Sequence, residues 1–217
     1  MNRTATLALA SLVLLGVTMA PWGEPRARET LLPAVGFVPD ASAAPGAEVH
    51  DTIWFVDQPS YRARLVMIND EQRQEYLRNR VRATTDPFAA AQTSKGFLTF
   101  VLELESKVEE ELVFQPQQCR LMTNRKEIRL PLDIPTIEAA YAAAQQEVPP
   151  AYEKARRALY DGEALLVPDD MLTGLLIYRG LDPKTKSFVM EIHVTTTEGE
   201  VEQFSVRYLR EKRKKKD

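Results

Sequence analysis

An alternating pattern between Phe97 and Glu105 constrains the fold more than any other feature. Every second residue there, beginning at Leu98, is large and apolar. Strand side chains point alternately to opposite faces, so a period of two predicts a strand with one buried face. Runs rich in β-branched and aromatic residues predict further strands at 52–56, 61–68, 112–114, 119–122, 128–132, 172–179, 188–195 and 201–209. We therefore expect a mainly β, antiparallel chain whose last three strands form a meander, with His193 on an exposed face.

Two segments depart from the β pattern. Asn69 and Gln72 have the form of a capping pair, and they predict a helix from Glu71 to about Ala83. The arginines of this helix, at 73, 78, 80 and 82, are interleaved with glutamates, so we expect a solvated face rather than an anion site. The Ala-rich stretch 134–160 predicts two short helices joined at Pro149-Pro150, and we interpret it as an insert that covers one end of the sheet.

The order of these pieces resembles the immunoglobulin-like β-sandwich modules of uncharacterised exported bacterial proteins. The likeness spans Phe97 to Leu209 and rests on residues 96–104, on 112–116 and on Val167-Pro168 leading into 174–178. Asp169 stands where a glycine usually follows the proline, and the insert departs from the pattern. The resemblance implies an antiparallel immunoglobulin-like sandwich over 51–209, with an N-terminal helix and a short helical insert, that binds or scaffolds. It implies no catalytic residue.

The N-terminus has the pattern of an export signal. Arg3 precedes an uncharged, mostly apolar run that ends near Ala20, which predicts a signal peptide at 1–20. A retained membrane anchor is the alternative, although the run is shorter than the roughly 20 residues of a spanning helix. Prolines at 21, 25, 33, 39 and 45 predict an extended linker over 21–50. We expect a periplasmic or extracellular protein, membrane-associated if the N-terminal segment is retained.

No residue pattern in the chain predicts catalysis, a cofactor or a metal. The adjacent carboxylates Asp169 and Asp170 follow Val167-Pro168, which is a turn sequence, and neighbouring residues that leave a turn usually diverge. The single cysteine, Cys119, lies in a strand-like run and is expected to be buried and inert. Nucleophile-elbow, Walker, dinucleotide-binding and zinc-protease motifs do not occur. We expect a protein that is not an enzyme.

The C-terminus carries a run of like charge. Residues 210–217 form a basic tail, and its consecutive cations are Lys212, Arg213, Lys214, Lys215 and Lys216. Such a run must stay solvated, and it is either a solubilising tail or a contact with an anionic surface. Outside the cytoplasm that surface would be phospholipid headgroups or acidic polysaccharide, and nucleic acid is not expected.

The chain has the composition of a globular protein, with 44% hydrophobic and 27% charged residues in 217. Together these features predict an exported, non-enzymatic protein that binds or scaffolds another envelope component. A small-ligand carrier with its pocket between sandwich and insert is the principal alternative, and a hydrolase comes third.

Overall fold

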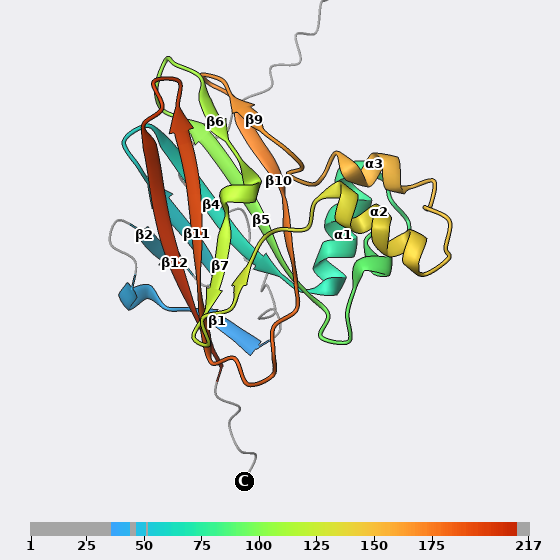
Figure 1. The fold of residues 1–217 in the computed structure, drawn as a ribbon. Helices are drawn as coiled ribbons and strands as arrows, with labels where there is room; N and C mark the ends of the chain where they lie inside the picture. The colour runs from blue at the N-terminus through green and yellow to red at the C-terminus, as the bar shows by residue number, and fades with distance from the viewer. Residues whose placement is uncertain (1–35, 44–46, 51, 212–217) are drawn as a thin grey trace, which may run out of the picture. The chain divides into compact units, whose positions relative to one another are not determined.

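The structure, a computed structural model, describes residues 36–43, 47–50 and 52–211. The predicted export signal at 1–20 and the tail cations 212–216 lie outside these ranges. Within them the chain is mainly β, as predicted, and its strands form two antiparallel sheets (Figure 1). In chain order the strands are β1 (Phe37–Pro39), β2 (Ala47–His50), β3 (Ile53–Asp57), β4 (Tyr61–Ile68), β5 (Phe97–Ser106), β6 (Leu112–Phe114), β7 (Arg120–Thr123), β8 (Ile128–Arg129), β9 (Ala164–Leu166), β10 (Met171–Arg179), β11 (Ser187–Thr196) and β12 (Val201–Arg210).

Sheet A is built around the C-terminal hairpin of β11 and β12. Its strand order is β1-β12-β11-β6-β9, and β7 pairs with β11 below β6 and carries β8 on its other side. Residues Phe188, Met190, Ile192 and Val194 of β11 are buried on one face, as their spacing predicts. His193, on the other face, is half-buried rather than exposed, and its Nε2 atom is shielded from solvent.

Sheet B has the order β10-β5-β4-β3-β2. The predicted C-terminal meander is therefore wrong at its first strand, because β10 pairs with β5 from Met171↔Glu105 to Arg179↔Phe97. The chain crosses from sheet B to sheet A between Gly180 and Lys186. A period of two reports which face of a strand is buried, but it does not say which neighbour the strand pairs with.

The two sheets pack face to face over an aromatic core. Phe100 of β5 meets Tyr208 of β12 with ring centroids 5.7 Å apart, and Phe188 of β11 stacks on the same tyrosine at 4.9 Å. Trp54 of β3 approaches Tyr208 edge-on at 6.4 Å. Each of these side chains is at most 1% exposed, so burial of this cluster stabilises the contact between sheets by several kcal/mol, at about 1.5–3 kcal/mol for a large apolar side chain.

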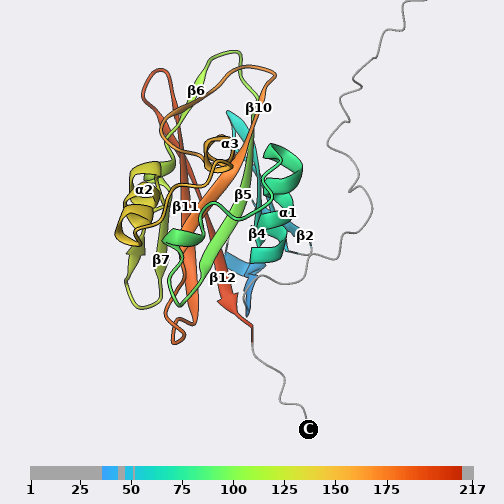
Figure 2. The same ribbon diagram turned by 90° about the vertical axis from the view of Figure 1, so that its right-hand side faces the viewer.

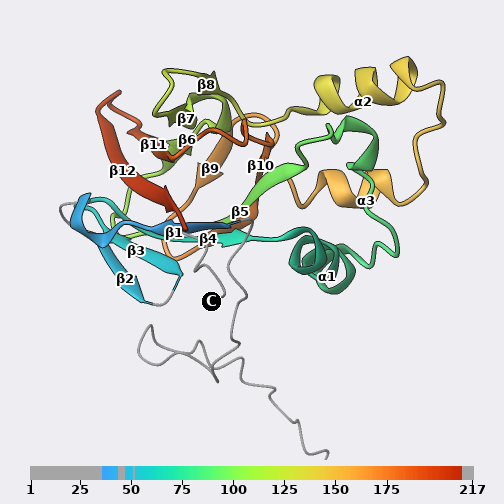
Figure 3. The same cartoon turned by 90° about the horizontal axis from the view of Figure 1, so that it is seen from below.

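A second core lies on the outer face of sheet B, under the helices α1 (Asp70–Val81), α2 (Ile134–Ala143) and α3 (Tyr152–Arg156) (Figures 2 and 3). Val101 of β5 and Leu175 of β10 pack there with Ile137 of α2. As a result β5 is buried on both faces from Phe97 to Leu102, whereas its alternation predicts one buried face. Short 3-10 turns occur at Ala41–Ala43, Ala89–Ala91 and Pro116–Gln118.

The helical insert, together with Leu132 just before it, also closes one edge of sheet B. The backbone N–H of Leu132 donates to the carbonyl of Ile177, and that of Leu175 donates to the carbonyl of Ala158, both at 2.7 Å. The backbone N–H of Tyr160 donates to the carbonyl of Leu175 at 3.1 Å. An unpaired edge strand is a template for pairing with another chain. The insert occupies this edge along the central part of β10.

Helix α1 forms where its capping pair predicts. The Asn69 side chain accepts from the backbone N–H of Gln72, and the Gln72 side chain accepts from that of Asn69. The expectation of a fully solvated arginine face is wrong for Arg73, which is 1% exposed. Its guanidinium donates to Asp70, Asp86 and Thr99 and stacks over the Phe97 ring.

The last part of the predicted linker belongs to the sheets. β1 pairs with β12 from Phe37↔Arg210 to Pro39↔Tyr208, and β2 pairs with β3 from Ala47↔Val56 to His50↔Ile53. Phe37 packs edge-on against Phe188 at 5.1 Å, so it belongs to the inter-sheet core. The Pro and Ala content of 21–50 hid these short edge strands, because a proline is tolerated at a sheet edge.

Candidate anionic-surface site

The two carboxylates that end the Val167–Asp170 segment serve a turn, as predicted. The backbone N–H of Asp170 donates to the carbonyl of Val167 at 3.2 Å. Asp169 has φ +59°, the left-handed conformation that Asp and Asn tolerate better than most residues. The Asp170 carboxylate accepts from the backbone N–H of Met171 at 2.8 Å. Asp169 is the third residue of this turn, and a positive φ there favours glycine but is also tolerated by Asp and Asn.

Cys119 is fully buried in the inter-sheet core, as expected of an inert thiol. Burial raises the pKa of this thiol to about 12, so it stays protonated at neutral pH. The Tyr178 hydroxyl donates to the Cys119 backbone carbonyl at 3.4 Å. Within the described ranges, histidine, cysteine and acidic side chains do not gather into a group that could hold a metal ion. None of the helices described combines the length and hydropathy that a membrane span needs.

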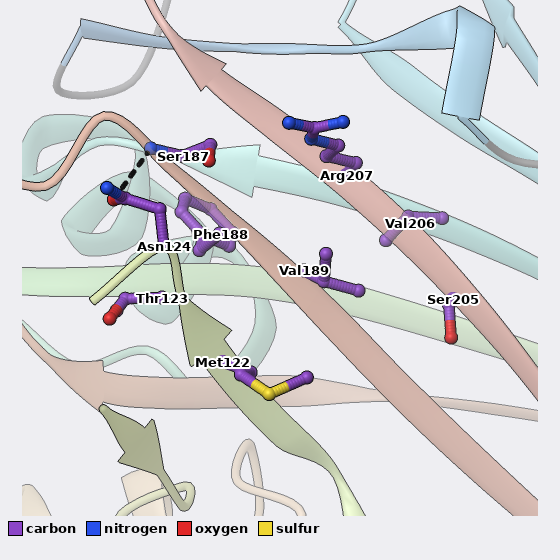
Figure 4. A pocket seen from close by; sticks show the side chains of 9 residues that line it. All are labelled: Met122, Thr123, Asn124, Ser187, Phe188, Val189, Ser205, Val206 and Arg207. Atoms are coloured by element: carbon purple, nitrogen blue, oxygen red, sulfur yellow. Dashed lines mark hydrogen bonds between the residues drawn. The ribbon is translucent and has the colours of Figure 1, made fainter. Parts of the chain in front are cut away.

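Two surface depressions are formed by the described residues. One is a groove of about 430 Å³ on the outer face of sheet A, lined by residues of β7, β11 and β12 (Figure 4). The other, of about 490 Å³, lies beside α3. Buried side chains such as Ile137, Tyr152 and Leu175 pack between sheet B and the insert, the place where the alternative of a small-ligand carrier puts its pocket.

One end of the sandwich collects exposed cations from loops far apart in sequence. We call this surface the basic end, and its residues are Lys95, Arg125, Lys126, Lys184, Lys186 and Arg210. They come from the loop before β5, the turn between β7 and β8, the crossover before β11 and the last residue of β12. This is the lower end of the sandwich in Figure 1, where β10 leads into β11.

Backbone hydrogen bonds hold these loops together around residues 180–186. The N–H of Gly180 donates to the carbonyl of Gly96 at 2.9 Å, and a Cβ added at Gly180 would lie 2.0 Å from the Lys95 carbonyl oxygen. Only glycine permits so close an approach of two backbones. The Asn124 side chain accepts from the N–H groups of Lys186 and Ser187 at 2.8 and 3.3 Å. The basic end is therefore a preorganised surface.

Asp182 lies among the cations of the basic end. Its carboxylate is 3.9 Å from Lys95 Nζ and 3.6 Å from Arg125 Nη1. The pKa of Asp182 is lowered, mainly because the backbone N–H of Lys184 donates to it at 2.7 Å and to a smaller extent by the nearby cations. Asp182 orients Lys95 and Arg125. Glu211, exposed and next to Arg210, is a second carboxylate at this end, and the six cations still leave a surplus of positive charge.

The C-terminal strand ends at this same surface. Arg210 Nε donates to the carbonyl of Thr185 at 2.6 Å, and the Arg210 backbone N–H donates to the carbonyl of Lys186. The Arg210 guanidinium lies 4.7 Å from the Phe37 ring centroid. Arg210, predicted as the first tail residue, is thus part of β12. The predicted contact residues Lys212–Lys216 follow Glu211 in sequence but lie outside the described residues.

Sequence reasoning missed the folded part of this site. Its cations occur singly or in pairs within turns, and such residues ordinarily only solvate a loop. The available signal was that the segments 123–126 and 181–186, which separate predicted strands, and the tail all carry lysine or arginine. Their gathering depends on strand order, which the sequence pattern did not give.

The opposite end of the sandwich has the opposite charge. Its exposed carboxylates come from the loop after β5, the β11–β12 hairpin and the turn before β10, and they are Glu109, Glu110, Glu111, Glu198, Glu200, Asp169 and Asp170. Thr197 Oγ1 donates to Glu110 at 3.0 Å and joins two of these loops. The formal net charge of −3 thus conceals two ends of opposite sign.

No protein-family model matches the sequence, and no curated protein matches it. A solved structure assigned as an ApaA protein, from Bordetella pertussis, is similar over 71% of this chain and 94% of that chain, with 9% sequence identity and a TM-score of 0.34.

Proposed function

We propose that this chain is an exported, non-enzymatic envelope protein that attaches to an anionic surface through its basic end and its C-terminal tail. The observation that carries the proposal is that β12 ends at Arg210 within the basic end, and in the sequence the five tail cations follow one residue later, after Glu211. Five tail cations near an anionic membrane contribute on the order of 1 kcal/mol each.

The sandwich in this proposal is a module of immunoglobulin-like arrangement. Two antiparallel sheets facing each other over one core support it, and so does the C-terminal hairpin β11–β12 in sheet A. Export is supported by Arg3 and the apolar run to Ala20. N-terminal sequencing of the chain recovered from an envelope fraction tests export, and an intact Met1 in a cytoplasmic pool would contradict it.

Binding to vesicles tests the attachment. The mature chain is expected to sediment with vesicles that contain anionic lipid at low salt, and removal of residues 212–217 should weaken this partitioning about tenfold or more. Replacing Lys184 and Lys186 with glutamine in the intact chain should weaken it as well, because both belong to the basic end. Raising the salt should reduce binding of every form, since screening acts on exposed charges.

A matched control removes the same charge elsewhere. Arg78 of α1 and Lys154 of α3 are exposed cations on the helical layer, away from the basic end. Replacing both with glutamine is expected to leave vesicle binding nearly unchanged. Equal loss in the two double variants would mean that only net charge matters, and equal binding with and without the tail would leave the tail a solubilising segment.

A further inference from the structure

The hairpin of β7 and β8 carries exposed apolar side chains next to the basic end. Met122 is 39% exposed, Ile128 60% and Leu130 49%. Met122 and Ile128 are paired across the hairpin, and Val189 of β11 is paired with Met122 on its other side. Leu130 follows Ile128 at the two-residue spacing that keeps a side chain on one face. We call these four residues the apolar hairpin face.

This face is continuous with a groove. Met122 and Val189 line the depression on the outer face of sheet A, and Figure 4 shows Val189 between Met122 and Arg207. Asn124 and Ser187 form the end of the groove toward the crossover loop, where Asn124 accepts from Ser187. The buried side chains of α1, α2 and α3 pack with residues of sheet B, and none of the described helices contributes to the lining of this groove.

Cations border the apolar hairpin face. Lys126 is in the hairpin turn, Arg120 starts β7, and Arg207 is paired with Val189. The acidic side chains of this region each have a cation beside them. Glu127 pairs with Arg129 at 3.0 Å and Asp40 with Arg207 at 3.7 Å, and Glu191 is in register with Arg120. The region therefore presents apolar and cationic groups without a surplus of negative charge.

We propose that the anionic surface this protein contacts is a phospholipid bilayer, and that Met122, Ile128 and Leu130 enter its headgroup region while the cations of the basic end engage the phosphates. The inference rests on the proposed function and selects between its two anionic sources. An acidic polysaccharide is a hydrated chain with no apolar layer in which such side chains could be buried. A bilayer offers both an anionic surface and an apolar boundary a few ångströms below it.

The two contributions respond differently to salt. Attraction between exposed charges is screened at about 0.5 M salt, but burial of apolar surface is not weakened by screening. The chain should therefore keep a salt-resistant fraction of vesicle binding. Replacing Ile128 and Leu130 together with serine should reduce that fraction about tenfold, in line with the transfer free energy of two partly buried aliphatic side chains.

The far end of the same sheet supplies the matched control. Val201 and Leu165 are 56% and 51% exposed, and they lie at the acidic end of sheet A. Replacing both with serine removes a similar exposed apolar surface and is expected to leave salt-resistant binding unchanged. Circular dichroism and the melting temperature of both double variants establish that each is folded.

A tryptophan at the contact reports insertion directly. In Ile128→Trp the new indole should shift its emission to the blue on addition of anionic vesicles and be quenched by lipids brominated near the headgroups. In Val201→Trp neither change is expected. Emission from the native Trp22 and Trp54 is subtracted with the unsubstituted chain.

The outcomes separate the inference from the proposed function. Vesicle binding that depends on the tail but is unaffected by the Ile128 and Leu130 replacements, with no shift in Ile128→Trp, overturns the inference and leaves the anionic attachment standing. Tail-dependent binding to an acidic polysaccharide but not to vesicles would likewise overturn the inference and leave the anionic attachment standing. Failure to bind either polyanion removes the proposed attachment itself.

Discussion

Arg73 shows how much one side chain can anchor a helix. Its guanidinium is buried between α1 and sheet B, 2.7 Å from Asp70 and 2.5 Å from Asp86, and Nη1 also donates to Thr99 at 3.1 Å. Asp86 is itself only 8% exposed. Burial of a charge is tolerated only when hydrogen bonds and an opposite charge replace its water, and here the helix, the following loop and β5 supply them.

We predict that Arg73→Ala lowers the free energy of unfolding by about 3 kcal/mol or more, because it leaves the Asp86 carboxylate buried without its partner. Urea titration followed by circular dichroism measures the change. Arg78→Ala on the same helix is exposed and should change stability by less than about 0.5 kcal/mol. Similar small losses in both variants would contradict the role given to Arg73.

The sequence could not distinguish Arg73 from its neighbours. Interleaved glutamates made all the arginines of α1 look solvated, and the partner that buries Arg73 lies 13 residues away in a loop without a pattern of its own. The same limit applies to the basic end, whose residues are ordinary loop cations until strand order brings them together.

At the scale of elements, the insert is held to sheet B by a close contact between a ring and a glycine. Tyr160 rests on Gly174 of β10, and its hydroxyl donates to the carbonyl of Leu102 at 3.1 Å. A Cβ at position 174 would lie 2.8 Å from Tyr160 Cδ2. The absence of a side chain at Gly174 leaves room for the Tyr160 ring, which packs in the inter-sheet core against Phe114 with ring centroids 4.8 Å apart.

We predict that Gly174→Ala destabilises the protein by about 1–3 kcal/mol, the usual cost of overpacking a filled core. Thermal and urea unfolding measure it, with Thr173→Ala at the neighbouring, partly exposed position as the control. A neutral Gly174→Ala would show that Tyr160 moves aside freely, and the insert would then be a loosely held cover.

The strands and helices were largely predictable, but their partners were not. Local patterns placed β4, β5, β11, β12 and the capping box of α1 correctly, because side-chain alternation and capping act within a few residues. They failed where a distant segment decides the outcome. β10 joins β5 rather than β11, and β1 and β2 become strands only because β12 and β3 offer edges to them.

At the scale of the whole molecule, every tyrosine is withdrawn from water. The chain has seven, and burial raises the pKa of each hydroxyl above its ordinary value of 10.0. For Tyr152 the pKa reaches about 12. Because the folded pKa values are raised, the neutral hydroxyls contribute stability in full below about pH 10, and that stability is lost as the pH rises from 10 toward the folded values.

We predict that absorbance at 295 nm stays nearly flat through pH 10 and then rises in one steep step that coincides with loss of the far-ultraviolet circular dichroism signal. Unfolding exposes all the hydroxyls together, so they ionise with the transition rather than singly. The protein in urea is the control and should titrate gradually around pH 10. A gradual rise near pH 10 in the folded protein would contradict the burial of these side chains.

The separation of charge between the two ends of the sandwich also sets how the molecule behaves far from any partner. A formal charge of −3 describes a particle that should be held only by a positively charged column. The basic end, with its lysines and arginines, can bind a cation exchanger, and the acidic end, with its glutamates, can bind an anion exchanger. The protein should therefore be retained by both types of column at neutral pH. The separation of charge gives the molecule a dipole, and the electric field of a charged surface orients that dipole before contact is made. A collision with a negative surface then begins at the basic end, the side of the molecule where β12 ends.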